Sequence, residues 1–230
     1  MDAAQVERAV ILGWYWENQK TCDILNAATA RAIAPYADRL SAFCAINPQA
    51  ENLVENLTYA RDMGFVGIGE LNSSVQNFRS DSENFAQLCE MSAAYNMPLS
   101  IHLSDSNGKD YPNKILTDNG AIYKAASAFP KTKFILAHWG GGEVFKEGFV
   151  APKNIFYDTA ANSLLYGKDA WQKINGRLAE QMIYGSDYPL RLYPRIAKEE
   201  EMLNFVNEAR ENVPSHHQEK FFAQNFCKCF

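Results

Sequence analysis

Short apolar stretches and helical stretches alternate along this chain about every thirty residues, and this alternation restricts the possible folds more than any other feature. The stretches that we read as strands cover residues 9–12, 40–46, 65–70, 99–103, 133–138, 154–159 and 181–187. Regular strand–helix alternation without hairpin signals predicts a parallel sheet covered by helices. No Gly-, Ser- or Pro-rich linker divides the chain, so we expect residues 1–230 to form one domain.

Helical patterns lie between these strands and follow the last one. They cover approximately residues 22–36, 50–63, 82–95, 119–129, 168–178, 197–212 and 217–230. Gly64 comes directly after the second pattern, where a glycine is typical of a helix C-cap. The C-terminal stretch is expected to be an amphipathic helix that begins near the His216–His217 pair.

The ends of the predicted strands distinguish between two parallel folds, an open doubly wound sheet and a barrel. At least five strands are followed or ended by polar or aromatic residues, namely Trp14 and Trp16, Glu70, His102, His138, and Asp187. A barrel gathers all its strand ends around one pocket, whereas an open sheet concentrates them at one switch point. We therefore predict an α/β fold of the TIM type, a (β/α)8 barrel in a seven-stranded version.

Two histidines and an aspartate at strand ends predict a site centred on a metal ion or a general base. Imidazole and carboxylate groups are good zinc ligands, so His102, His138 and Asp187 are candidate ligands, and Glu70 is a fourth. His138 and Asp187 are also candidate catalytic bases. The alternatives are a hydrogen-bonded core histidine, an aspartate that holds a turn before Tyr188-Pro189, and a glutamate that caps the following segment.

Candidate substrate-binding residues surround this predicted site. Trp14, Trp16 and Tyr188 offer flat walls for a planar substrate, although aromatic residues after a strand are more often part of the core. Arg191 follows the last strand and would bind a substrate carboxylate, unless it is a surface arginine. The glycines at 140–142 either let a substrate oxygen approach backbone N–H groups or only permit a tight turn.

Composition excludes some classes of partner and leaves others open. The formal charge of −5 is spread along the chain and no basic run indicates nucleic-acid binding. No apolar stretch approaches the roughly 20 residues of a membrane helix, and the first residues do not have the pattern of a signal peptide. Five scattered cysteines predict free thiols in a reducing cytoplasm. The sequence leaves the oligomeric state open, a homo-oligomer included, and the expected partner is a small-molecule substrate.

The strand-end motifs resemble those of the amidohydrolase-related family of metal-dependent hydrolases, which are (β/α)8 barrels. The matching stretches are Val66–Glu70, Pro98–His102, Phe134–Gly141 and Ile183–Pro189, with an Asn-containing C-terminal helix around Asn225. The resemblance implies that His102 is the fifth-strand metal ligand and that Asp187 binds metal or takes a proton from bound water. It implies that His138 is a second ligand or a polarising base, and that Glu70 occupies a fourth-strand ligand position.

The front of the chain departs from the family pattern. The family's first strand ends in His-x-His, and no such pair occurs in this sequence. Counting strands gives the same result, since seven are predicted instead of eight. We expect two sheet edges, at the strands of Val10 and Ile183, that must be covered or close up against each other. We also expect weaker metal binding, and an in-frame upstream sequence that encodes the missing strand.

The leading functional hypothesis is a metal-dependent hydrolase that uses metal-activated water, with zinc as the expected divalent cation, on a small ester, lactone or amide. Asp187 would carry the proton to the leaving group. The alternative is a non-oxidative decarboxylase of an aromatic or unsaturated acid, a chemistry that also occurs in the family. A third reading is a catalytically impaired, truncated barrel that acts as a binding protein.

Overall fold

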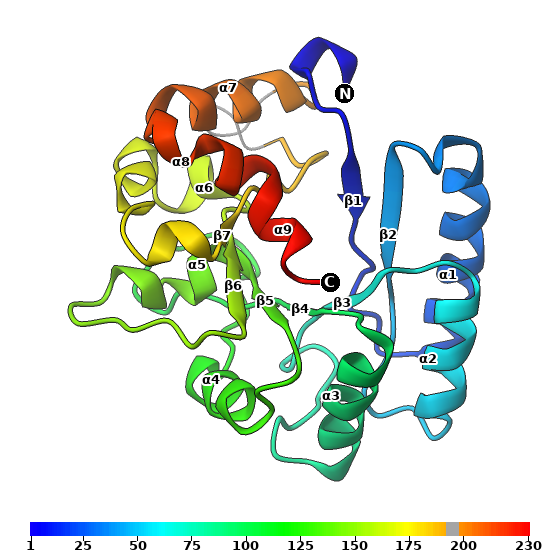
Figure 1. Cartoon of the computed structure of the whole chain (residues 1–230). Coiled ribbons are helices and arrows are strands. Elements are labelled where there is room, and N and C mark those ends of the chain that lie inside the picture. The colour runs from blue at the N-terminus through cyan, green and yellow to red at the C-terminus, as the bar shows by residue number, and fades with distance from the viewer. Residues whose placement is uncertain (192–197) are drawn as a thin grey trace.

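The computed structural model describes residues 1–191 and 198–230, and it is built around one parallel sheet (Figure 1). The seven strands are β1 (Ala9–Ile11), β2 (Leu40–Cys44), β3 (Gly67–Leu71), β4 (Leu99–Ile101), β5 (Phe134–Leu136), β6 (Ile155–Asp158) and β7 (Met182–Ile183). They pair in sequence order, and every pair is parallel. The sheet is a curled half-barrel with flanking helices, which confirms the predicted TIM-type barrel with seven strands.

Helices connect the strands and lie mostly on the outer face of the sheet (Figure 1). The longer ones are α1 (Gln19–Ile33), α2 (Leu53–Asp62), α3 (Glu83–Tyr95), α4 (Asn119–Ala128) and α7 (Met202–Asn212). The short ones are α5 (Ala137–Gly141), α6 (Asn162–Leu165), α8 (Ser215–Glu219) and α9 (Asn225–Cys227). Side chains cap three of the longer helices at their N-termini, because Asn18, Ser82 and Asp118 each accept a hydrogen bond from a first-turn N–H.

Two of the predicted helices differ from the structure. The stretch 168–178 forms two short 3-10 turns, Lys168–Lys173 and Leu178–Glu180, because Gly176 between them has a φ of +50°, which cannot continue a right-handed helix. The helix predicted for 197–212 begins at Met202; its first predicted residue, 197, lies outside the described residues. The C-terminal stretch is helical as predicted, but a π-helical turn at Lys220–Gln224 interrupts it.

Side chains from alternate strand positions fill the concave face of the half-barrel. Phe43, Ile135, Phe156 and Ile183 form a buried cluster there together with Cys229 from the C-terminus. Phe43 has room for its ring because residue 67 is a glycine, whose added Cβ would lie 2.4 Å from that ring. The C-terminal segment therefore completes the interior that seven strands leave open.

The two edge strands of the sheet, β7 and β1, are covered to different extents. The C-terminal segment covers β7, since the Tyr184 N–H donates to the Phe221 carbonyl (3.1 Å) and the Asn225 amide donates to the carbonyl of Met182 (2.8 Å). Figure 1 shows this segment, in red, between β7 and β1. Among the described residues β1 pairs only with β2, and Ile11 at its end is 40% exposed. The expected covering of an edge is present at β7.

Candidate functional site

The ends of β3, β4 and β5 bring one carboxylate and two imidazoles together. Glu70 lies in β3, His102 directly follows β4, and His138 is the second residue after β5. His102 Nδ1 is 3.3 Å from Glu70 Oε1 and 3.2 Å from His138 Nε2, and Glu70 Oε1 is 4.0 Å from His138 Nε2. These three side chains are mostly buried. The structure therefore assembles three of the four predicted metal ligands.

The donor atoms of these three residues are spaced as ligands of one small cation. Four donors around zinc at about 2.0–2.1 Å stand roughly 3.3 Å from one another in a tetrahedron. The triangle formed by Glu70, His102 and His138 has sides of 3.3, 3.2 and 4.0 Å. Two neutral imidazole nitrogens and one carboxylate oxygen suit a divalent metal. The cluster can therefore hold such an ion with small side-chain adjustments.

Asp187 lies at the border of this cluster rather than within it. Its Oδ2 is 4.0 Å from His138 Nδ1, the nitrogen that faces away from His102. Asp187 has a φ of +59°, so the chain turns sharply after β7 and brings this carboxyl group towards the histidine. Its side chain is 29% exposed, and it is therefore open to a ligand in the barrel mouth.

Backbone groups and a second carboxylate fix His138. Its Nδ1 is 3.0 Å from the Ala160 carbonyl, which can only accept a hydrogen bond, so Nδ1 carries a proton, and Nε2 faces His102 Nδ1 at 3.2 Å. Asp158, at the end of β6, accepts hydrogen bonds from the backbone N–H groups of His138 and Ala160, both at 3.0 Å. These contacts orient the His138 ring so that Nε2 points at the cluster.

The segment that carries His138 has a rare backbone conformation. Residues 138–142 all have positive φ, with values of +55° at His138 and +57° at Trp139. A left-handed turn costs roughly 1–2 kcal/mol for each non-glycine residue, so surrounding contacts must hold it. The hydroxyl of Tyr123 donates to Gly140 O (3.3 Å), and the amide of Asn119 donates to Gly141 O (3.4 Å). The glycines thus permit a tight turn.

The electrostatic environment favours the neutral forms of the acids. Burial raises the pKa of Glu70 to about 7, against the opposing effect of His138. Burial also raises the pKa of Asp158 and Asp187, with Glu70 adding to the rise at Asp187. Burial lowers the pKa of His102, so this imidazole stays neutral. A neutral His102 is in the state that a metal ion requires of a ligand, whereas Glu70 would have to lose its proton to bind one.

The predicted substrate-binding residues Trp14, Trp16, Tyr188 and Arg191 are all exposed. Trp14 stacks on Tyr15 with ring centroids 4.4 Å apart, and Tyr15 in turn lies 5.7 Å from the His102 ring. Trp16 is 38% exposed. Tyr188 is exposed beside Asp187, and Arg191 pairs on the surface with Glu200 at 2.8 Å. The structure therefore connects Trp14 to the cluster through Tyr15.

Sequence reasoning missed Asp158 as a functional candidate. This residue is the last of β6, and the same rule of polar residues at strand ends would have identified it. Tyr111, on the long loop after β4, was also missed. Its pKa is raised, mainly by burial and then by the negative charge of Asp187. No motif distinguishes such a loop residue.

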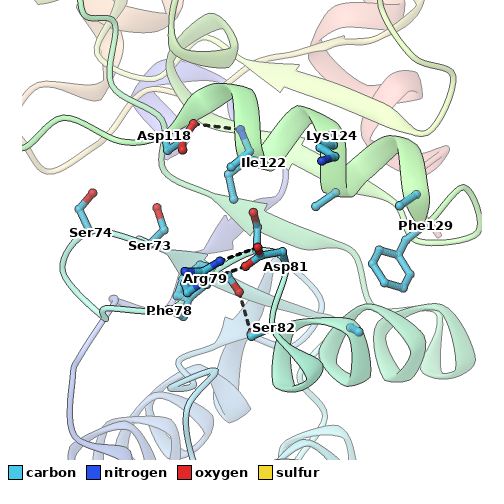
Figure 2. Close-up of a pocket in the computed structure, with 15 residues that line it drawn as sticks. Ser73, Ser74, Phe78, Arg79, Asp81, Ser82, Asp118, Ile122, Lys124 and Phe129 are labelled. Atoms are coloured by element: carbon cyan, nitrogen blue, oxygen red, sulfur yellow. Dashed lines mark hydrogen bonds and ion pairs between the residues drawn. The ribbon is translucent and has the colours of Figure 1, made fainter.

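A cavity of about 600 Å³ lies elsewhere, between α3 and α4 on the outside of the barrel (Figure 2). Phe78, Ile122 and Phe129 line its apolar part, and Arg79 pairs with Asp81 (2.7 Å) at its rim. None of the cluster residues lines it. The cavity is therefore separate from the candidate site.

Comparison with known proteins identifies the family. A family model described as amidohydrolase matches residues 1–225, which is nearly the whole chain. This chain belongs to the amidohydrolase family. No curated protein sequence matches it. All five cysteines of this chain are free thiols. No helix in the described part of the chain is long and apolar enough to cross a membrane.

Solved structures share the fold of this amidohydrolase at low sequence identity. An uncharacterised TIM-barrel protein from Bordetella bronchiseptica has a TM-score of 0.74 and 18% identity, covering 100% of this chain and 79% of that chain. A 5-carboxyvanillate decarboxylase from Novosphingobium aromaticivorans, complexed with manganese and a nitrobenzoic acid, has a TM-score of 0.74 and 17% identity (100% and 77% covered). A 2,6-dihydroxybenzoate decarboxylase from Rhizobium has a TM-score of 0.71 and 15% identity (100% and 85% covered).

Proposed function

We propose that this amidohydrolase is a divalent-metal-dependent, non-oxidative decarboxylase of a planar aromatic acid. The observation that carries the proposal is the stacked Trp14–Tyr15 pair, which provides a flat apolar wall 5.7 Å from the His102 ring of the cluster. A flat wall beside a cation site suits an aromatic ring that bears oxygen substituents. Decarboxylases among the fold neighbours, two of them with manganese, support this choice over hydrolysis.

Glu70, His102 and His138 would hold the cation. When bound, a divalent cation supplies Lewis acidity and an attachment point for the oxygens of the substrate. Asp187 stands beside this set, 4.0 Å from His138, and would be a fourth ligand or a proton donor. Zinc suits the imidazole-rich donor set, and the manganese in the neighbours makes that ion the second metal to test.

The chain's own acid supplies the proton that decarboxylation consumes. The bond between the ring carbon and the carboxylate carbon breaks, carbon dioxide leaves, and the electron pair remains on the ring carbon. Asp187, whose raised pKa favours the protonated form, would give its proton to that carbon and regain one from solvent. Tyr15 and Trp14 would hold the ring flat, and their bulk would keep water from the reacting carbon.

Release of carbon dioxide from hydroxybenzoate-type acids tests the proposal. We expect protein reconstituted with Mn²⁺ or Zn²⁺ to produce carbon dioxide and the decarboxylated phenol in equal amounts. Asp187→Asn should abolish this turnover while the protein stays folded. Undiminished turnover in that variant contradicts the assigned proton donor. Turnover of esters, lactones or amides by the wild type, without carbon dioxide release, would instead support hydrolysis by metal-activated water.

A further inference from the structure

A buried carboxylate on α7 lies at the end of a chain of hydrogen bonds that leads to His138. Glu208 is 5% exposed and has no ion pair among the described residues. Its Oε1 accepts hydrogen bonds from Trp171 Nε1 (3.0 Å) and from Asn162 Nδ2 (3.3 Å). Its Oε2 accepts one from the Ser163 hydroxyl (3.1 Å). Burying a carboxylate among neutral donors costs free energy of folding, because no charged partner compensates the lost hydration. A role for Glu208 other than charge pairing is therefore expected.

Asn162 connects this carboxylate to the left-handed turn. Its Oδ1 accepts a hydrogen bond from Trp139 Nε1 at 3.0 Å, and Trp139 is the residue directly after His138. The Asn162 amide nitrogen donates to Glu208 Oε1 (3.3 Å) and to the Gly167 carbonyl (3.1 Å), so the amide group turns its N–H side towards these two acceptors. The amide oxygen must then face the indole, which is a donor only. Each group in the chain fixes the orientation of the next.

We propose that Glu208 is a positioning residue that, through Asn162 and Trp139, holds the left-handed turn in the form that directs His138 Nε2 at the cluster. The Trp139 indole is fully buried, and its ring contacts Trp171 at a centroid distance of 5.9 Å. Trp171 also donates to Glu208, so both indoles around the turn are tied to one carboxylate. This role deepens the proposed function, because it rests on His138 being a metal ligand there.

Three variants and a matched control test the proposal. Glu208→Ala and Asn162→Ala each break one link of the chain. Glu208→Gln keeps an acceptor for both N–H donors, and its amide can donate to the Ser163 hydroxyl. The control is Asn154→Ala, which removes a buried amide bonded to three carbonyls, those of Ala126, Phe129 and Thr132, away from His138.

Two measurements are made on each full-length variant: the affinity for Mn²⁺ by calorimetry, and the imidazole nitrogen resonances of His138 in the metal-free protein. We expect Glu208→Ala and Asn162→Ala to weaken Mn²⁺ binding by about 10–100-fold and to shift or broaden the His138 resonances. Glu208→Gln should keep both properties near the wild type. Asn154→Ala should leave them unchanged even where it lowers the melting temperature.

Several outcomes overturn the positioning role. One is unchanged Mn²⁺ affinity and unchanged His138 resonances in Glu208→Ala and Asn162→Ala. Another is an equal loss in the Asn154→Ala control, which would indicate a general structural effect. If the wild type binds no Mn²⁺, the proposed metal-dependent function fails, and the His138 resonances of the metal-free variants still decide whether Glu208 orients that side chain.

Discussion

The stability of the metal-free protein should fall as the pH rises, because of Glu70. Burial raises the pKa of this carboxyl from 4.5 to about 7 in the folded state, whereas the unfolded chain has the ordinary value. Between these two values the folded protein binds more protons, so its stability is greatest below the unfolded pKa and is lost as the pH rises through the folded one. At about 1.4 kcal/mol per pKa unit, this loss is about 3 kcal/mol in the free energy of unfolding.

Other groups near the cluster also titrate, so the measurement is the difference between wild type and Glu70→Gln. Urea unfolding of both proteins in the presence of a chelator, followed by tryptophan fluorescence from pH 4.5 to 7.5, gives the two stability curves. We expect Glu70→Gln to become more stable relative to wild type by about 3 kcal/mol across this range. Glu90→Gln, on the exposed side of α3, should follow the wild type. A constant difference between Glu70→Gln and wild type would refute the reasoning.

Three further substitutions test the left-handed turn, the covering of β7 and the aromatic wall. Gly142→Ala should lower the free energy of unfolding by about 2 kcal/mol or more, because residue 142 has a φ of +81° and an added Cβ would lie 2.3 Å from the Asp105 carboxylate. Gly148 also has a positive φ but has open space around it, so Gly148→Ala should lower the free energy of unfolding by less. Equal losses in denaturant unfolding would contradict the packing argument. Asn225→Ala should cost about 2–3 kcal/mol by leaving the β7 edge carbonyl of Met182 without its donor, and a loss below 1 kcal/mol would contradict that covering. Tyr15→Leu should reduce kcat/KM for an aromatic acid about tenfold or more by removing the flat wall, whereas unchanged kinetics would remove Tyr15 from the site.

The sequence predicts the sheet well because strand–helix alternation and strand-end chemistry are local patterns. The positions of all seven strands follow from their apolar runs; the observed strands are shorter than predicted, and β3 ends at Leu71, one residue after its predicted end. Glu70, His102 and His138 meet because parallel strands place their carboxyl ends at one edge of the sheet. This part of the site needs no knowledge of the loops.

The rest of the site depends on contacts between distant segments. A run of glycines after His138 predicts a turn, but its left-handed form depends on Asp158, Asn119 and Tyr123 from other elements. The role of Glu208 is equally invisible in the sequence, where it reads as one more charge on the helix α7. Its burial results from how α7 packs against Trp171, and no local pattern contains that information.

The covering of β7 also comes from long-range packing. The C-terminal stretch reads as an amphipathic helix, and its apolar side could face any part of the sheet. In the structure Phe226 stacks on Phe43 at 6.4 Å, and Cys229 is fully buried in the concave cluster. The segment thereby fills the interior of a sheet with one strand fewer than a closed barrel.

Metal titration tests most directly whether Glu70, His102 and His138 form one metal site. The wild-type protein, first freed of metal with a chelator, should bind one Mn²⁺ or one Zn²⁺ ion per chain when titrated by calorimetry. His102→Ala should stay folded, as judged by circular dichroism, and bind neither ion at this site. Absence of binding to the wild type, or full binding by His102→Ala, would contradict the account.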